Sequence, residues 1–316
     1  MRTETVPTIY VIHENDDWMV PLRSAFKTIG VNFVEWHFGN GDTFDFSSIP
    51  PQGVFYNRMS ASSHTRSHRY AAEHTHAVLE WLELNQRRVV NNSRALALET
   101  AVGSYDNAKH ETSKSKITKQ AQSIFGGDKP FITKHNRSGK GLGVHLFKDV
   151  KDLESYLDSD AITVTDEERP VDGVLLLQEY ITAPKPEINR AEFINGELTY
   201  IVTIDTSNGF ELCPADQCQI RTKPMFVIRK NDQFLEDEQV LATKIKKFLI
   251  ENGIEIAGVE YIRDSQTNEL LVYDVNTNTN YNPSAEKVAG EANMMKIAKF
   301  LKSELDLLSV EDVEAD

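Results

Sequence analysis

Cysteine is scarce in this sequence, with only Cys213 and Cys218 among 316 residues. Two thiols in the segment CPADQC cannot form a disulfide framework. Their spacing is wider than that of a zinc knuckle, and no second pair of cysteines exists to complete four ligands. We therefore interpret both as structural thiols rather than metal ligands, and we expect the protein to work in the reducing cytoplasm.

Positive charge and long apolar runs are also lacking. Lys and Arg number 34 against 48 Asp and Glu, which gives a formal net charge of -14. An extended nucleic-acid-binding surface would be basic, so we expect no nucleic-acid partner, although a local basic cluster would still bind a small anion. No apolar run is long enough to span a membrane, and the N-terminal residues lack the apolar core of a signal peptide. We expect no membrane partner.

The N-terminal part alternates strand and helix patterns. Short apolar runs at Thr8–His13, Val31–Trp36 and Gly53–Tyr56 predict strands, and Pro21–Thr28 predicts a helix that Gly30 ends. This order predicts an open α/β layer, in which ligands bind at the carboxyl ends of the strands. The residues that follow the third strand are therefore candidate substrate residues, namely Asn57, Arg58, Ser60 and, further along, His64.

Four of the nine histidines follow closely, at positions 64, 68, 74 and 76. A cluster of histidines suggests a metal site. However, the pattern predicts a helix over Ala71–Asn85, and residues two apart on a helix, such as His74 and His76, do not share a face. We favour solvated or substrate-facing histidines, which with Arg58, Arg66 and Arg69 would form a basic pocket for a carboxylate or phosphate.

The central segment Pro130–Phe147, PFITKHNRSGKGLGVHLF, predicts a strand, a glycine-rich loop and a second strand. Backbone amides without side chains, beside Lys134, Arg137 and Lys140, suit a polyphosphate. A Walker loop or a Rossmann fingerprint requires a helix after the glycines, whereas a strand follows here. The remaining interpretations are a flap over a nucleotide and a plain hairpin turn with solvated lysines.

The remaining pattern is mixed α and β. Val174–Ile181 is an apolar strand that turns polar at Gln178 and Glu179, which either meet an adenine ring or run out to the surface. Residues 101–116 are polar and irregular. We predict a strand at Arg88–Asn91, a hairpin of Glu187–Phe193 with Leu198–Ile204, and helices at Ser93–Glu99, Lys116–Phe125, Asp149–Leu157, Glu236–Asn252 and Ser284–Leu308.

A second hairpin carries acidic residues inside apolar strands. Ile256–Ile262 contains Glu260, and Leu270–Val275 contains Asp274, with Asn276 two residues on. In an antiparallel pair, Asp274 and Asn276 point to one face and Glu260 can lie opposite them. Carboxylates in such strands are costly unless paired or metal-bound, and oxygen ligands suit Mg²⁺. The alternative is a hairpin with an acidic outer face.

Taken in order, these segments resemble the ATP-grasp superfamily, closest to its ribosomal-protein-modifying glutamate ligases and glutathione synthetases. The matching pieces are FITKHNRSGKGLGV, VLLLQEYI, INRAEF, GVEYI and VYDVNTNTNYNP, with YNRM and RVVN resembling the preceding substrate-side domain. The resemblance implies an ATP-grasp fold of mixed α/β class behind an open α/β domain. It divides the chain into a substrate-side domain (1–98), a central subdomain with the flap (99–182) and a C-terminal subdomain with the Mg site (183–316).

The resemblance also implies roles for single residues. Lys134 would contact the nucleotide phosphates, Arg190 would lie near the transferred phosphate, and Glu260, Asp274 and Asn276 would bind Mg²⁺, with Mn²⁺ as a possible substitute. The order of glutamate and aspartate is exchanged relative to the family pattern, but both offer anionic oxygens. The remaining nucleotide-binding residues would be Ser138, Gly139, Lys140, Gly141 and Gly143 of the flap, with Gln178, Glu179, Tyr180, Ile181 and Glu187.

One feature departs from the family. A first nucleotide lysine normally precedes the central strand at the start of a helix, with a further helix and strand between them. The interval from Glu99 to Lys134 is short and irregular, so we expect a truncated or degenerate central domain. Lys114 or Lys116 is the candidate for that lysine.

The resemblance implies an ATP-dependent carboxylate–amine ligase that works through an acyl phosphate. Its substrates would be a small-molecule or peptide carboxylate and an amine, and many relatives associate, so a homo-oligomer is possible. Two alternatives stay open. One is a nucleotide-binding module without ligase activity that serves a partner or regulatory role, and the less favoured one is a small-molecule kinase.

Overall fold

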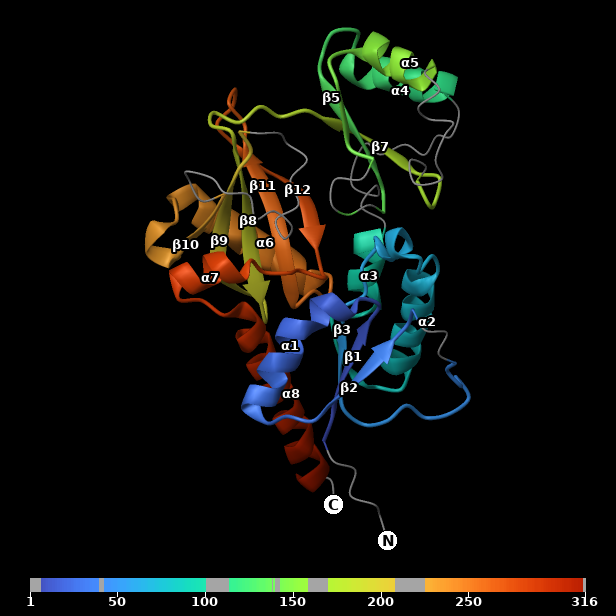
Figure 1. Cartoon of the computed structure of the whole chain (residues 1–316), viewed down its shortest axis with the longest axis vertical. Helices are drawn as coiled ribbons and strands as arrows, with labels where there is room; N and C mark the ends of the chain where they lie inside the picture. The colour runs from blue at the N-terminus through green and yellow to red at the C-terminus, as the bar shows by residue number, and fades with distance from the viewer. Residues whose placement is uncertain are drawn as a thin grey trace.

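The computed structural model describes residues 7–39, 43–100, 114–137, 139, 143–158, 170–207 and 225–314. Three separate β-sheets with helices on their faces make up this part of the chain (Figure 1). The predicted mixed α/β class is confirmed. The predicted flap residues Ser138, Lys140 and Gly141, the two cysteines and most of the irregular stretch (101–113) lie outside the described residues.

The first sheet is parallel and has the strand order β2-β1-β3-β4. Its strands are β1 (Ile9–His13), β2 (Phe33–His37), β3 (Val54–Asn57) and β4 (Arg88–Val90). Alternate residues of β1 face opposite sides, as the period of two requires. Ile9 and Val11 pack with helix α1 (Asp16–Ile29), whereas Ile12 packs with helix α2 (Ala71–Leu84). The predicted open α/β layer is therefore present.

Helix α1 begins five residues before the predicted start at Pro21. The side chain of Asn15 accepts hydrogen bonds from the backbone N–H groups of Asp17 and Trp18, which caps the first turn. Asp16 and Asp17 add negative charge at the positive end of the helix dipole. The cap and the dipole together extend the helix ahead of its proline.

The second sheet is antiparallel, in the order β6-β5-β7. It consists of β5 (Phe131–His135), β6 (His145–Phe147) and β7 (Leu175–Glu179). Phe131 and Phe147 pack with apolar residues of helices α4 (Lys114–Phe125) and α5 (Val150–Asp158). The predicted strands on either side of the glycine-rich loop are thus confirmed as neighbours.

The third sheet is antiparallel, in the order β10-β9-β8-β11-β12. In the predicted hairpin, Asn195 and Gly196 both have positive φ, as the tight turn between β8 and β9 requires. The strands are β8 (Glu187–Ile194), β9 (Glu197–Asp205), β10 (Phe226–Arg229), β11 (Ile256–Arg263) and β12 (Leu270–Asn276), and helix α6 (Glu236–Glu251) packs on one face.

The remaining elements are short, apart from the last helix. Helix α3 (Ser93–Thr100) and two 3-10 turns, η1 (Ser63–Arg66) and η5 (Asn231–Gln233), lie in connections. The predicted helical character of Ser284–Leu308 is confirmed, and the structure divides it into two helices, α7 (Pro283–Ala289) and α8 (Asn293–Glu314). Gly290 adopts the left-handed conformation with φ 67 between them, which ends the first helix.

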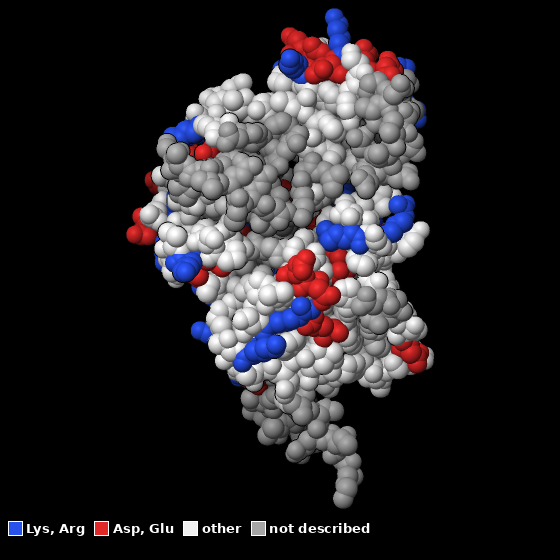
Figure 2. All heavy atoms as spheres, in the orientation of Figure 1, with Lys and Arg blue, Asp and Glu red and all other residues white. Residues whose placement is uncertain are grey.

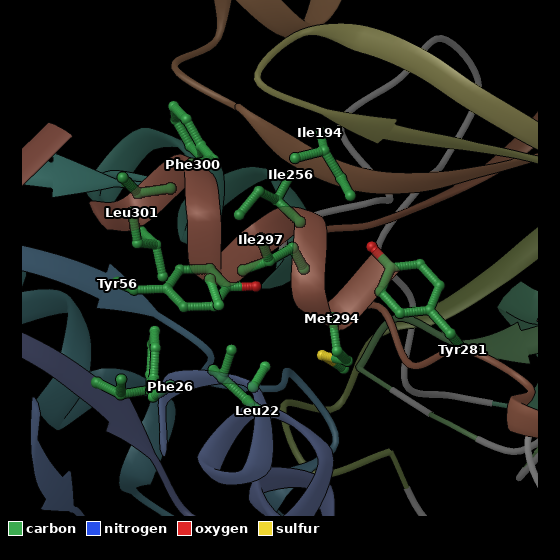
Figure 3. Packing of buried hydrophobic residues seen from close by; sticks show 14 of the residues in the cluster. Leu22, Phe26, Tyr56, Ile194, Ile256, Tyr281, Met294, Ile297, Phe300 and Leu301 are labelled. Carbon is green, nitrogen blue, oxygen red and sulfur yellow. The ribbon is translucent and has the colours of Figure 1, made fainter. Parts of the chain in front are cut away.

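Helix α8 returns to the N-terminal sheet and lies along α1 (Figure 1). Leu22 and Phe26 of α1 share one apolar cluster with Ile256 of the third sheet and with Ile297 and Leu301 of α8 (Figure 3). All five side chains are buried. The first and third sheets are therefore joined by a common core, although they lie far apart in the sequence.

A buried asparagine joins the same two sheets by hydrogen bonds. Asn91 is fully buried, and its side chain amide donates to the carbonyl oxygens of Ile256 and Thr277, each at 2.8 Å. Its side chain oxygen accepts from the backbone N–H groups of Glu255 and Ile256 at 2.9 and 3.0 Å. Nearby, Arg88 pairs with Glu255. These bonds attach the carboxyl end of β4 to the start of β11 and the end of β12.

None of the described helices is long and apolar enough to cross a membrane. On the face shown in Figure 2, acidic and basic side chains occur in small mixed groups.

We expect the substitution Asn91→Ala to lower the free energy of unfolding by on the order of 3 kcal/mol or more, because buried backbone groups lose their partners. Alanine is also strained at the φ of 58 that Asn91 adopts. Urea denaturation followed by tryptophan fluorescence measures the loss. The matched control is Asn92→Ala, which removes one capping hydrogen bond to the N–H of Ala95. We expect this variant to lower the free energy of unfolding by about 1 kcal/mol. Equal losses would contradict the role of Asn91.

Candidate active site

Charged side chains of the second and third sheets come together on one face of the third sheet, next to β5. Glu260 on β11 lies opposite Asp274 on β12 and opposite Arg190 on β8. Residues directly opposite in antiparallel strands project to the same face. Lys134 of β5 reaches the same place, since its Nζ lies 3.4 Å from Oδ1 of Asp274. The structure thus brings together four residues that the sequence analysis named.

The facing carboxylates suit a cation. Burial and the charge of Asp274 raise the pKa of Glu260, while Arg190, whose nearest guanidinium nitrogen lies 3.8 Å away, opposes the shift. The side chain amide of Asn276 donates to Oδ2 of Asp274 at 3.0 Å, which leaves its oxygen as the ligating atom. Two carboxylates and an amide oxygen form an oxygen-only donor set. These residues therefore fit Mg²⁺.

Arg190 is held in a buried network on the other side of Glu260. Its Nε lies 2.9 Å from a carboxylate oxygen of Glu192, and its guanidinium also donates to the hydroxyl of Thr279. That hydroxyl donates to Glu192 at 2.9 Å. Burial raises the pKa of Glu192 to about 7 against the opposing effect of Arg190. A Cβ at Gly258 would lie 2.3 Å from Nε of Arg190, so glycine makes room for the guanidinium.

Both described flap glycines occupy crowded positions. A Cβ on Gly139 would lie 2.7 Å from the hydroxyl oxygen of Ser62, so this part of the flap approaches the loop that follows β3. Gly143 has φ 72, and a Cβ there would meet the ring of His135 at 2.4 Å. Close contact with neighbouring side chains, and at Gly143 also the positive φ, therefore explain glycine at these two positions.

The other predicted nucleotide residues follow the path from the second sheet to the third. On β7, Gln178 and Glu179 lie opposite Ile132 and Phe131, which places them on the strand beside that of Lys134. Tyr180 and Ile181 follow directly, and Glu187 begins β8. Of the candidates for the first nucleotide lysine, Lys116 lies on α4 with an exposed side chain.

The predicted substrate residues lie at the carboxyl end of the first sheet. The side chain amide of Asn57 donates to the carbonyl of Asn91. Arg58, which is 2% exposed, donates to Asn280 at 2.8 Å and to Asn278 at 3.2 Å, both neutral acceptors. Arg58 thereby ties β3 to the loop after the acidic strand β12. The hydroxyl of Ser60 pairs with that of Ser62 at 2.9 Å, and His64 is half-buried, which lowers its pKa.

The four clustered histidines lie in different environments. His64 contacts the carbonyl of Ala61, His74 stacks on Phe38, and His76 lies 3.8 Å from Glu80. The ring of His68 meets that of His37 edge-on. The four rings thus have different neighbours, and a solvated or substrate-facing role for them stays a prediction.

Another group of potential ligands, His13, Asp16 and His37, has atoms within 4.8 Å of one another. Arg23 already pairs with Asp16 at 2.5 Å, and the backbone N–H of Gly39 donates to Nδ1 of His37. The guanidinium would repel a cation at Asp16, and the Gly39 bond fixes the His37 proton on Nε2. We therefore assign this group to a hydrogen-bonded network.

The sequence analysis missed Glu99, Glu192 and Thr279 as parts of the site. Glu99 lies in the last turn of α3, accepts hydrogen bonds from Ala61 and Thr277, and has its pKa raised by burial. An acidic residue at the carboxyl end of a helix opposes the helix dipole. That position was a signal that Glu99 has a specific partner.

No protein-family description and no curated protein sequence matches this chain. Solved structures do match over nearly its whole length. The match with D-cycloserine synthetase DcsG covers 94% of this chain and 99% of the DcsG chain, with 15% identity and a TM-score of 0.60. The ATP-grasp ligase PsnB complexed with its minimal precursor, Mg and ADP covers 94% and 97%, with 15% identity and a TM-score of 0.58.

D-alanyl-alanine synthetase A from Vibrio cholerae O1 biovar eltor covers 95% of this chain and 99% of its own, with 11% identity and a TM-score of 0.61. Identities this low establish architecture and not activity. The three sheets, their order along the chain and these matches together show that the chain has the ATP-grasp fold.

Proposed function

We propose that the protein is an ATP-dependent carboxylate–amine ligase. The observation that carries the proposal is the meeting of Lys134 and Arg190 with the facing carboxylates Glu260 and Asp274, where the second and third sheets adjoin. Cations of this kind bind phosphates, and the oxygen donors suit the Mg²⁺ that accompanies ATP. The ligase descriptions of the matching structures support the same reaction class.

The proposed reaction has two steps. A substrate carboxylate oxygen attacks the γ-phosphorus of ATP, and the bond from that phosphorus to the β-phosphate oxygen breaks. ADP is released, and the substrate becomes an acyl phosphate. An amine then attacks the acyl carbon, loses a proton and expels phosphate, which forms the amide. Lys134 would bind the nucleotide phosphates, and Arg190 would face the transferred phosphoryl group. Mg²⁺ held by Glu260, Asp274 and Asn276 would supply neutralisation of the phosphate charge.

The residues of the flap and the strand β7 complete the proposed nucleotide site. Backbone amides of the flap, which includes Gly139 and Gly143, would contact phosphates. Adenine would lie beside Gln178–Ile181, with Glu187 nearby. Of the candidate substrate residues Asn57, Arg58, Ser60 and His64, the half-buried His64 would meet the carboxylate substrate. Asn57 and Arg58 are bonded inside the protein and would shape this end of the first sheet. The matching ligase PsnB has been solved in complex with a precursor peptide, so a peptide is one candidate substrate here, beside small acids. Cytoplasmic location, use of Mn²⁺ and a homo-oligomer stay predictions.

A nucleotide-binding module without ligase activity is the second candidate. The irregular sequence of residues 101–116 favours it, because the family resemblance implies a first nucleotide lysine in the part of the chain before the central strand. A small-molecule kinase is the third, and it would release a stable phosphorylated product without an amine. Measurement of products separates the three.

The first experiment is Mg²⁺-dependent ADP release from ATP with pooled acids and peptides, in the presence and absence of pooled amines and amino acids. A ligase releases ADP when both pools are present. Release with the acid pool alone, accompanied by a stable phosphorylated product, indicates the kinase. ATP binding without any ADP release indicates the non-catalytic module.

We expect Asp274→Asn to reduce Mg²⁺-dependent ADP release about 100-fold or more, because a charged ligand next to the phosphates is lost. Steady-state ADP release at saturating Mg²⁺ measures the effect. The matched control is Asp264→Asn in the turn of the same hairpin, where the carboxylate accepts a hydrogen bond from the N–H of Gln266. Full activity in the Asp274 variant would refute the metal assignment.

We expect Lys134→Met to raise the KM for ATP roughly tenfold, since a hydrogen bond to a charged phosphate contributes about 1.5 kcal/mol or more. Lys129→Met serves as the control, because Lys129 is exposed and precedes the same strand. The KM for ATP of each variant is compared at fixed Mg²⁺. An unchanged KM in the Lys134 variant would remove this lysine from the nucleotide site.

A further inference from the structure

Glu99 is half-buried, and its carboxylate has no role in the proposed reaction. It lies in the last turn of α3, and its two oxygens accept from different parts of the chain. Oε1 accepts from the backbone N–H of Ala61 at 3.2 Å. Oε2 accepts from the backbone N–H of Thr277 at 3.1 Å and also from the hydroxyl of Thr277.

The two partners of Glu99 belong to the two halves of the proposed site. Thr277 directly follows Asn276, the amide of which is bonded to Asp274. Ala61 lies between Ser60 and Ser62, and Ser62 is the residue that a side chain at Gly139 of the flap would meet. One carboxylate therefore connects the end of the acidic strand β12 with the loop that meets the flap.

A contribution to folding stability does not explain why a carboxylate occupies position 99. Glu99 opposes the dipole of its own helix, is desolvated, and is repelled by the charge of Asp274. The docking of the first sheet on the third is already provided by Asn91 and by the common apolar core. What Glu99 adds is an acceptor for two backbone N–H groups that no neutral apolar side chain would supply.

We propose that Glu99 is a positioning residue, which holds Asn276 and the loop of Ser60–Ser62 in a fixed relation so that the cation ligands and the substrate side of the site form together. The proposal rests on the proposed function. It does not make Glu99 a cation ligand, because three donors already occupy its two oxygens. Partners of this type typically change metal affinity or activity 10- to 100-fold when removed.

The test compares ADP binding with Mg²⁺ and with EDTA, by isothermal titration calorimetry on the full chain. Glu99→Gln keeps the size of the side chain but turns one acceptor into a donor that faces an N–H group. We expect the gain in ADP affinity that Mg²⁺ provides to fall about tenfold in this variant. Affinity for ADP in EDTA should stay the same, because no nucleotide contact is removed.

A carboxylate on α2, which bonds to the first residue of α3, offers a matched control. Glu83 accepts from the backbone N–H of Ser93 at 2.7 Å and from its hydroxyl at 2.8 Å, the same two donor types that Thr277 presents to Glu99. Glu83→Gln therefore removes a similar interaction away from the acidic strand. Its Mg²⁺-dependent gain should equal that of the wild type.

The outcomes separate this inference from the proposed function. A full Mg²⁺-dependent gain in Glu99→Gln, or an equal loss in Glu83→Gln, overturns the positioning role while the ligase proposal stands. Thr277→Val, which removes only the hydroxyl donor, decides the question if Glu99→Gln does not fold, and we expect a smaller loss in the same direction. A wild-type protein whose ADP affinity does not respond to Mg²⁺ overturns the metal site itself, and the inference with it.

Discussion

The hydrogen bonds of the Asn91 side chain are the constraint on which the geometry of the site depends. They attach the carboxyl end of the parallel sheet to Ile256 and Thr277 of the antiparallel sheet. Because Thr277 follows Asn276, the same bonds fix where the acidic strand ends. A side chain amide supplies both donors and acceptors at one point, which neither an apolar nor a charged residue of this size does. Two sheets far apart in the sequence thus share one boundary.

Around that boundary, two cations and three carboxylates lie in a row. Lys134 neighbours Asp274, Asp274 faces Glu260, Glu260 neighbours Arg190, and Arg190 pairs with Glu192. Each cation lies beside a carboxylate, so burial of the group is tolerated, yet the central pair of carboxylates faces each other directly. Such an arrangement is suited to bind a divalent cation with an anionic ligand, which is the physical basis of the ligase proposal.

Much of the local architecture was predictable from the sequence. The alternation in GVEYI and VYDVN placed Glu260 opposite Asp274, since strand periodicity is a local property of the chain. The Asn195–Gly196 turn followed from turn chemistry, and the strands around the glycine-rich loop followed from residues that favour strands. The start of α1 and the break at Gly290 were missed, because a cap and a left-handed residue override the apolar period. The domain boundaries at 98/99 and 182/183 stay predictions.

By itself, the sequence determined the α/β class, the elements that carry the charged residues and the side of each strand on which they lie, because these depend on neighbours in the chain. Only the tertiary structure decided that Lys134 reaches Asp274, that Asn57 and Arg58 are used inside the protein, and that Glu99 joins Ala61 to Thr277. The partners in these contacts are separated by 34 to 222 positions in the sequence. Local propensity carries no information about such partners, which are selected when the sheets pack together.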